Sequence, residues 1–335
     1  MQREQSVAVA VDIGGGQTTV ALIDHDGRVR YRCSAKTLRG RPALATLDPY
    51  LRAIDTMLEH AQKEDWHVCG VGVSVPGSLD HTSRRPLLVS MLPSLNSFPL
   101  CDLLETRYQL PTQLHVDVDA ALLGEYHFGA GQGCRRLLFL TINAVVGAAL
   151  AIDGQVERSS NYTGHICHLP IATNGPRCSC GKRGCMNTLI SMDAMQKMVQ
   201  RALRRGEETS LTQRLLESAS SVGGQGEPKG SRNREYFSAQ LLAEEAMRGD
   251  SVAQQIYAEV GRGVGSAVAR YVGLFEPHRL ILSGGVLSAG NLLLTQVRRS
   301  LSTPSSSRVC SMVEVVPSLL GNDAALVGSV APIFS

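Results

Sequence analysis

A histidine and three cysteines gather in one short segment, residues 165–185. Within it, His168 is followed by Cys178, Cys180 and Cys185. One imidazole and three thiolates form a ligand set that tetrahedral structural zinc prefers, and four protein ligands leave no position for water. Cys178, Cys180 and Cys185 are one third of the nine cysteines of the chain and fall within eight residues, which favours a metal site over a disulfide or an accidental thiol cluster. We therefore predict a structural Zn²⁺ site here.

A run of three glycines follows the first apolar segment of the chain. Residues 6–12 have the composition of a buried strand that ends in Asp12, and Gly14, Gly15 and Gly16 come shortly after it. Glycines let the backbone approach a phosphate closely, and the Asp12 carboxylate is suited to bind Mg²⁺ through water. This turn is therefore predicted to face a phosphate group.

A second strand–turn–strand unit, around residues 143–147, lacks most of these features. Gly147 is its only glycine, and the side chains of Val145, Ala148 and Ala149 would crowd a phosphate. Valine also resists positive φ. A plain buried strand and turn is the favoured interpretation, although the repeated strand–turn–strand pattern predicts a duplicated α/β architecture.

Two aspartates, Asp117 and Asp119, stand between a predicted strand and a predicted helix. A carboxylate at this place can act as a general base toward a hydroxyl group, and it can equally cap the N-terminus of the helix. We assign the cap to Asp119, which leaves Asp117 as the candidate base.

Hydrophobic periodicity predicts the elements that position these residues. Helices are expected over 43–63, 100–108, 119–128, 189–205, 238–249, 251–274 and 287–301, and strands over 6–12, 18–23, 68–75, 113–118, 137–142, 148–152, 279–283 and 312–316, with another from residue 28. We expect an N-terminal α/β lobe at 1–118 and a C-terminal lobe at 119–322. The segment 219–236 is expected to be a flexible loop, and a helix at 323–335 to pack back on the N-terminal lobe.

The composition excludes several classes of function. The 335 residues carry 33 basic and 30 acidic side chains, a net charge of +3, and no basic run that would favour nucleic acid. No apolar stretch is long enough to span a membrane. An odd number of cysteines without an export signal predicts a reducing, cytoplasmic location.

Several motifs together resemble the ROK family of repressors, open reading frames and sugar kinases. They are DIGGGQTTVALID near the N-terminus, GVSVPGSLD at 72–80, the cysteine segment CSCGKRGC, LILSGGV at 280–286 and LLGNDAALVGS at 319–329. The resemblance implies a two-lobed, ribonuclease H-like α/β fold of the actin-like ATPase and sugar-kinase type with a structural zinc site. It further implies a homo-oligomer that binds a sugar or sugar phosphate and, in the kinases, Mg·ATP. Gly284 and Gly285 are then candidates to contact the nucleotide, Gly77 to contact the sugar, and Asp117 matches the family's catalytic aspartate.

The chain departs from the family pattern where a sugar or phosphate is bound. The family's sugar-binding polar residues are replaced by Met91, Val116, His165 and Asn187, a family Thr by Gly16, and a family Gly by Cys167. Each lost contact to a sugar hydroxyl costs about 1–3 kcal/mol, and Thr18 and His165 are possible substitutes for the missing groups.

These residues are compatible with two functions. The first is a regulator-type module without catalysis, which keeps the scaffold and a small-ligand site that includes His165 and Asn187. Because the chain starts at the first predicted strand, we expect no DNA binding by this chain alone. The alternative is an ATP-dependent hexose or N-acetylhexosamine kinase with Asp117 as its base. The glycine and hydroxyl residues that are missing from the two turns favour the regulator-type module.

Overall fold

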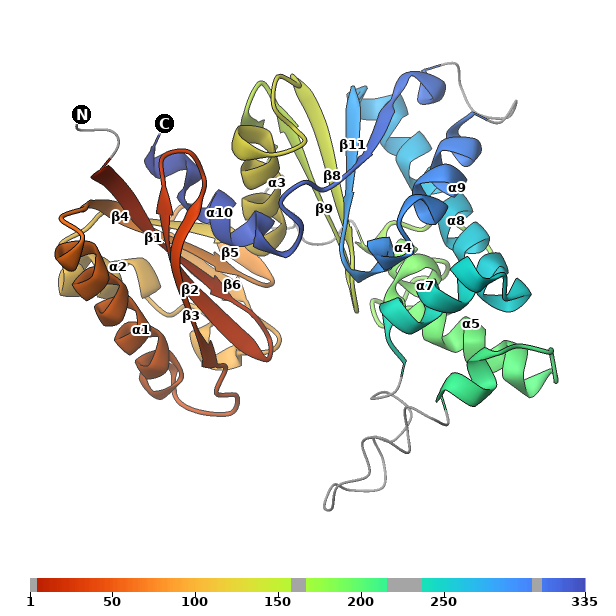
Figure 1. Cartoon of the computed structure of the whole chain (residues 1–335), viewed down its shortest axis with the longest axis horizontal. Helices are drawn as coiled ribbons and strands as arrows, with labels where there is room; N and C mark the ends of the chain where they lie inside the picture. Colours follow the sequence, from red (N-terminus) through yellow and green to blue (C-terminus); the bar gives the residue numbers. More distant parts are fainter. Residues whose placement is uncertain (1–4, 158–166, 216–236, 303–308, 335) are drawn as a thin grey trace. The chain divides into compact units, whose positions relative to one another are not determined.

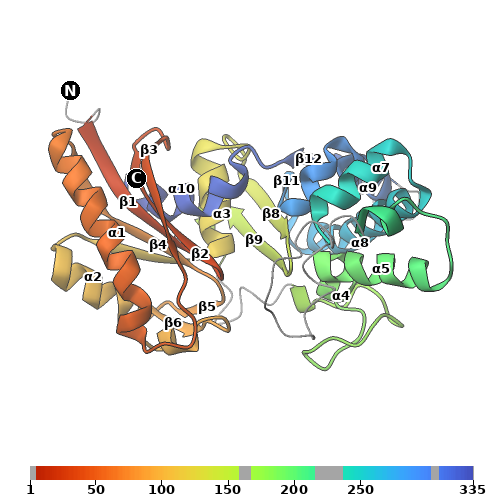
Figure 2. The same cartoon turned by 60° about the horizontal axis from the view of Figure 1, so that its bottom comes forward.

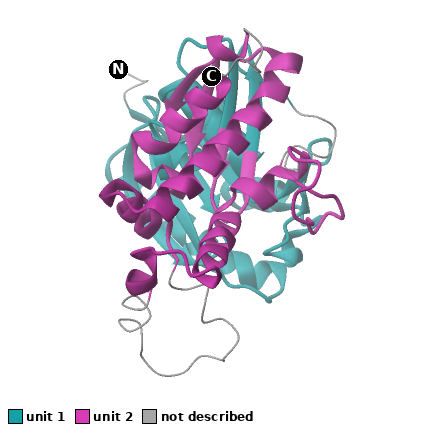
Figure 3. Ribbon diagram, turned by 90° about the vertical axis from the view of Figure 1, so that its right-hand side faces the viewer, with its two compact units in different colours: residues 1–139, 148–164, 318–335 teal, residues 140–147, 165–317 magenta. Residues whose placement is uncertain are grey.

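The chain forms two compact units (Figure 3). The computed structural model describes residues 5–157, 167–215, 237–302 and 309–334. Unit 1 comprises residues 1–139, 148–164 and 318–335, and unit 2 comprises 140–147 and 165–317. The loop predicted at 219–236 lies outside the described residues. The lobe boundary expected near Asp119 is a different division of the chain and stays a prediction.

Unit 1 is built on a five-stranded sheet in which three neighbouring strands are parallel. Its strand order is β3-β2-β1-β4-β7; β1 pairs antiparallel with β2 and parallel with β4, which pairs parallel with β7. The strands are β1 (Ser6–Ile13), β2 (Gln17–Asp24), β3 (Val29–Lys36), β4 (His67–Val75) and β7 (Thr112–Val116). Residues 7–11 of β1 are all buried, as expected for an apolar strand covered on both faces.

Helices cover both faces of this sheet. Helices α1 (Ala43–Lys63) and α2 (Leu100–Tyr108) lie on one face, and α3 (Asp117–Phe128) and α10 (Ala324–Val330) on the other (Figure 1). On the second face, alanines of β1 and β2 form a cluster with Leu326, Val327 and Val330 of α10. Small alanine side chains let the C-terminal helix lie close to the strands. A hairpin of β5 (Ser78–Asp80) and β6 (Arg85–Leu88), which the sequence analysis missed, follows β4.

Helices α3 and α10 cross at backbone contact. A Cβ atom placed on Gly328 would lie 1.7 Å from the carbonyl oxygen of Ala120, and one on Gly124 would lie 2.4 Å from that of Ala324. Glycine is therefore required on both helices. Helix α3, expected at the start of the C-terminal lobe, belongs to unit 1 because of this packing.

The buried carboxylate of Glu125 joins the end of α3 to the segment before α10. Its oxygens accept hydrogen bonds from the Ser318 hydroxyl, from Ala130 N–H at 2.7 Å and from Leu320 N–H at 2.9 Å. Leu319 N–H donates a longer bond of 3.3 Å. Because its side chain is removed from solvent, the oxygen atoms of Glu125 depend on these four donors for their hydrogen bonds.

A second five-stranded sheet has the order β10-β9-β8-β11-β12. Its strands are β8 (Arg136–Ile142), β9 (Val146–Ile152), β10 (Gln155–Val156), β11 (Arg279–Ser283) and β12 (Glu314–Pro317). In unit 2, the long helix α8 (Ser251–Phe275) contacts four other helices (Figure 2). These are α4 (Met186–Ile190), α5 (Met192–Arg204), α7 (Ala239–Arg248) and α9 (Asn291–Leu301).

Most predicted elements are present, with three corrections. The helix predicted at 119–128 begins at Asp117, and the helix predicted over 189–205 is divided into α4 and α5. The division falls at Ser191, whose hydroxyl accepts from Ala194 N–H and so caps α5. A short 3₁₀ helix at Gly285–Ala289 precedes α9, which begins later than expected. No helix in the described part of the chain is long and apolar enough to cross a membrane.

Glu125→Ala is expected to lower the free energy of unfolding of unit 1 by about 3 kcal/mol, because several buried donors lose a charged acceptor. Fluorescence of the single tryptophan, Trp66, during urea unfolding reports on this unit. Glu59→Ala, an exposed position on α1, is the matched control. Equal urea midpoints for the two variants would contradict the structural role given to Glu125.

Candidate functional site

Three neighbouring parallel strands of unit 1 end in a row of polar residues. In the register of β1 and β4, Asp12 stands opposite Ser74. In that of β4 and β7, Val75 stands opposite Val116, and Asp117 follows directly. The carboxyl ends of parallel strands are the usual place for ligands in α/β sheets. The fold thus brings two predicted site residues, Asp12 and Asp117, to one edge.

The Asp12 carboxylate is held by a hydroxyl that the sequence analysis missed. Oδ1 of Asp12 accepts a hydrogen bond from Oγ of Ser74, a fully buried residue in an apolar strand. Burial raises the pKa of Asp12, the bond from Ser74 opposes this rise, and the charge of Asp323 adds to it. Asp12 is therefore fixed in direction but is a weaker acid than usual.

The pKa of Asp117 lies in the range that suits a general base. Its side chain is partly exposed, and Oδ1 accepts from Val118 N–H at 2.8 Å. Burial raises its pKa to about 7; the Val118 N–H opposes this rise, and the charges of Asp12 and Asp119 add to it. A base with a pKa near the working pH is effective in proton transfer. The cap predicted for Asp119 is wrong, because α3 begins at Asp117 and Asp119 is a buried residue inside its first turn.

The other residues of unit 1 that were expected to contact a sugar either are apolar or are required by the backbone of unit 1. Val116 is 1% exposed and therefore belongs to the core, whereas Met91 is 40% exposed. Gly77 has φ +118, and a Cβ there would lie 1.9 Å from the carbonyl oxygen of Leu88. The β5–β6 hairpin therefore requires this glycine whether or not a ligand is bound.

The first glycine turn is braced from within unit 1. Gly14 N–H donates to the carbonyl of Gln17 at 3.1 Å, and the Thr37 hydroxyl donates to the carbonyl of Gly14 at 2.8 Å. Thr18 is fully buried and shares a hydrogen bond with the Thr37 hydroxyl. Thr18 therefore cannot supply the hydroxyl that is missing at Gly16, and that expectation is wrong. A Cβ on Gly16 would meet nothing within 4 Å, so the turn has open space there.

The second turn, in unit 2, is closed by side-chain amides. Oδ1 of Asn143 accepts from Gly285 N–H at 2.9 Å, and Oδ1 of Asn187 accepts from Val146 N–H at 3.0 Å. The carbonyl of Asn143 also accepts from Met192 N–H at 2.9 Å. Two backbone N–H groups at this turn, those of Gly285 and Val146, are thus already bonded inside the unit.

Only one of the three side chains expected to crowd this turn is exposed. Val145 is 57% exposed, whereas Ala148 and Ala149 are buried residues of strand β9. Of the crowding expected from three side chains, only that of Val145 is left, because the two alanines are part of the buried strand. Gly147 also lies in β9. Gly284 has φ +99, and a Cβ there would lie 2.4 Å from the carbonyl oxygen of Ile142, so this glycine has a structural reason of its own.

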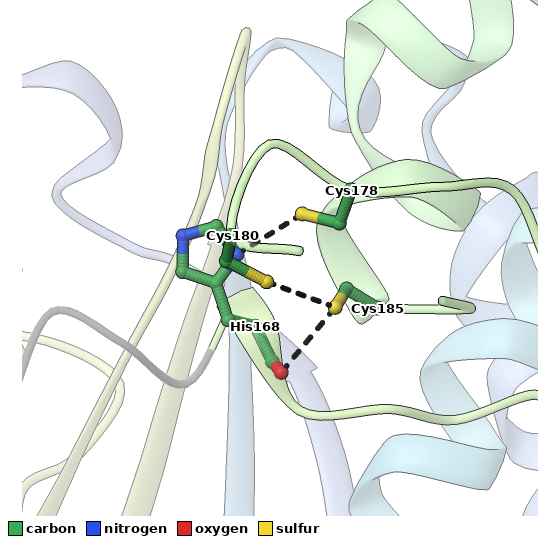
Figure 4. Close-up of side chains that lie close together, drawn as sticks. All are labelled: His168, Cys178, Cys180 and Cys185. Atoms are coloured by element: carbon green, nitrogen blue, oxygen red, sulfur yellow. Dashed lines mark hydrogen bonds between the residues drawn. The ribbon is translucent and has the colours of Figure 1, made fainter. Parts of the chain in front are cut away.

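The predicted metal ligands come together in unit 2. The ligand atoms of His168, Cys178, Cys180 and Cys185 all lie within 4.8 Å of one another (Figure 4). Nδ1 of His168 is 3.2 Å from Sγ of Cys178, and Sγ of Cys180 is 3.6 Å from Sγ of Cys185. The chemistry of this donor set fits a tetrahedral Zn²⁺ ion.

Two glycines bend the backbone around this cluster. Gly181 has φ +90 and Gly184 has φ +64, a region that other residues rarely adopt. Gly181 N–H donates to the carbonyl of Cys178 at 3.0 Å, which closes a tight turn between the ligands. A Cβ on Gly184 would lie 1.7 Å from the carbonyl oxygen of Ala172. The turn therefore holds the thiols together through local backbone geometry.

His165 lies outside the described residues, so its place in a ligand site stays a prediction. Ser74, Asn143 and Arg39, which bonds the first glycine turn, are polar residues that the sequence analysis did not single out. The hydrogen-bond partner of each is distant in the sequence. Only Ser74 could have been recognised from the sequence, because it is a lone hydroxyl residue in the apolar run 71–75.

Comparison with known proteins places these features in a family. The model of the ROK family matches residues 8–333. A glucokinase from Thermotoga maritima is 28% identical over 324 residues, which cover 96% of this chain and 95% of that protein. The DNA-binding transcriptional dual regulator NagC from Escherichia coli is 24% identical, with coverage of 95% and 73%. The structure of a ROK family glucokinase from Streptomyces griseus, in complex with glucose and AMPPNP, has a TM-score of 0.73 at 27% identity and covers 96% of this chain and 97% of its own.

Asp117→Asn is expected to stabilise the protein at pH 8 by about 2 kcal/mol and to have little effect near pH 4.5. A carboxyl whose pKa is raised to about 7 on folding favours the folded state while protonated, so its ionisation costs stability as the pH rises from about 4 to 7. Melting temperatures across this range provide the measurement, with Asp48→Asn on the exposed face of α1 as control. A difference between Asp117→Asn and wild type that does not change with pH would contradict the raised pKa.

Proposed function

Because the chain belongs to the ROK family, we propose that it is a sugar-binding module of the regulator type, in which phosphoryl transfer is absent or very slow. The observation that carries this proposal is the second turn, where Asn143 and Asn187 accept the N–H groups of Gly285 and Val146. A nucleotide phosphate would need to displace both amides and to pass the exposed Val145.

The sugar side of the site is proposed to keep fewer contacts than a kinase uses. Asp117 accepts a hydroxyl of the ligand, and Gly77 lets the backbone approach it closely. In unit 2, His165 and Asn187 stay the residues predicted from the sequence to contact a ligand. Since Asn187 Oδ1 is already bonded to Val146 N–H, its amide nitrogen is the group that remains for a ligand. Assembly into a homo-oligomer, which the resemblance implies, stays a prediction.

The second candidate is an ATP-dependent sugar kinase, and one observation favours it. The pKa of Asp117, raised to about 7 by burial, suits a base that takes a proton from a sugar hydroxyl. Asp12 would then help to hold Mg²⁺, and Gly14 and Gly15 would face the phosphates. The eroded second turn argues against this candidate because phosphoryl transfer depends on donors placed around the transferred group.

A structural Zn²⁺ ion is proposed to be held by His168, Cys178, Cys180 and Cys185. When bound, such an ion fills its four positions with protein ligands and supplies folding free energy. The metal would then hold the segment 168–185 in one conformation, and this segment leads directly into α4, which contains Asn187. The metal would thus fix the amide that closes the second turn.

Turnover is expected to be negligible for glucose, N-acetylglucosamine, N-acetylmannosamine and fructose with MgATP. A coupled assay of ADP release measures it, and Asp117→Asn serves as the blank. Turnover within the ordinary range of kinases, about 1–100 per second, that is lost in Asp117→Asn would establish the second candidate instead.

The purified protein is expected to contain about one zinc per chain. Cys178→Ser should lose the metal and melt at a lower temperature, because three remaining ligands bind zinc weakly. Cys69→Ser, a partly exposed cysteine outside the cluster, should retain it. Elemental analysis of protein prepared without chelators, together with thermal melts, provides the measurement. A metal-free protein whose melting is unchanged by Cys178→Ser would exclude the site.

A further inference from the structure

Cys180 is the member of the cysteine cluster that solvent reaches most easily. All nine cysteines of the chain lie in the part that the structure describes, and Cys180 alone among them is exposed. In the cluster, Cys178 and Cys185 are buried and His168 is partly buried. The susceptibility of a thiol to oxidation follows its exposure, so a dissolved oxidant meets Cys180 before the other thiols.

A second thiol lies beside this exposed one. Sγ of Cys180 is 3.6 Å from Sγ of Cys185, and a dashed line joins the two atoms in Figure 4. The sulfur atoms of a disulfide are about 2.0 Å apart, so a shift of about 1.6 Å is enough to join them. Cys178 makes a different contact, with its Sγ 3.2 Å from Nδ1 of His168. The structure therefore favours a disulfide between Cys180 and Cys185.

The backbone fixes one member of this pair and leaves the other room to move. Directly after Cys185, Met186 N–H donates to the carbonyl of Leu169 at 2.8 Å, a bond that needs no metal. Cys180 lies in the exposed turn between the ligands, next to Gly181, where a Cβ would meet nothing within 4 Å. The turn can therefore carry Cys180 toward Cys185 while the start of α4 keeps its place.

We propose that Cys180 and Cys185 are a site of oxidative modification, at which a peroxide converts the two thiols into a disulfide. The modification withdraws two of the four proposed Zn²⁺ ligands, and His168 and Cys178 alone do not complete a tetrahedral site. This inference goes beyond the proposed sugar-binding function. It rests on the proposed Zn²⁺ site only for the expected release of metal, whereas the pairing of the two cysteines does not depend on the ion.

Hydrogen peroxide is the only oxidant that the reaction needs. Sγ of Cys180 attacks one peroxide oxygen: an S–O bond forms, the O–O bond breaks, and the other oxygen takes the thiol proton and leaves as water. Sγ of Cys185 then attacks Sγ of Cys180, so that an S–S bond forms, the S–O bond breaks, and hydroxide leaves as water with the second thiol proton. Each sulfur loses one electron and the peroxide gains two. A dithiol reductant reverses the modification by thiol–disulfide exchange.

Mass spectrometry of peptides from the full chain, as purified, tests the pairing after treatment with hydrogen peroxide. Alkylation first marks the cysteines that remain free, and trypsin then separates the pair by cutting after Lys182 and Arg183. The expected product is a peptide with Cys180 joined to one with Cys185, in which Cys178 is alkylated. A colorimetric zinc indicator in the same samples should report the release of metal, and dithiothreitol should restore both thiols.

Two variants separate the proposed site from general oxidation. Cys180→His keeps a side chain that binds zinc but has no thiol, so it should retain its metal at a peroxide dose that releases zinc from the wild type. Cys69→Ser removes a partly exposed cysteine outside the cluster and should behave as the wild type does. If Cys180→His does not fold, the peptide map of the wild type still decides.

Three results would overturn the assignment. They are the absence of a disulfide at Cys180, a pairing of Cys185 with any other cysteine, and a disulfide between the two that leaves zinc bound. A chain that contains no zinc would refute the proposed metal site, and the peptide map would still decide the pairing. Neither readout depends on a sugar or on turnover, so a failure of the proposed function is seen separately.

Discussion

A backbone turn can bind a phosphate only if its N–H groups are not already bonded within the protein. In unit 2, two N–H groups at the second turn are already bonded, because Asn143 accepts from Gly285 and Asn187 accepts from Val146. One amide belongs to the turn itself, and the other belongs to α4, the helix that follows the cysteine cluster. The whole functional interpretation depends on these two bonds.

Unit 1 retains more of the features expected of an active site. Asp12 and Asp117 stand at the ends of parallel strands, and burial raises the pKa of both carboxyls. Such acidity serves a general base, but it serves equally a group that holds a ligand hydroxyl without reaction. The retained aspartate therefore does not decide between catalysis and binding, and the decision rests on the phosphate contacts.

The parts of the fold that follow from local sequence could be predicted, and those that depend on distant partners could not. The apolar periodicity of 43–63 and 100–108 gave the helices α1 and α2 with their observed bounds. The four metal ligands were recognised because they lie close together in sequence. By contrast, the hydrogen bond between Gly285 and Asn143 joins residues 142 positions apart, and no local sequence pattern predicts it. Asp119 was misassigned because α3 begins two residues earlier than predicted. Both aspartates therefore lie inside its first turn, and Val116 stands at the N-cap without a side-chain hydrogen bond.

Titration of the wild type with a magnesium complex of a non-hydrolysable ATP analogue tests the central claim most directly. A variant that reopens the second turn, with Asn143→Gly, Ala144→Thr and Val145→Gly combined, is titrated beside it after its melting temperature has shown that it is folded. The account predicts no saturation of the wild type at millimolar analogue and a gain of binding in the variant. Micromolar binding by the wild type, unchanged in the variant, would contradict it.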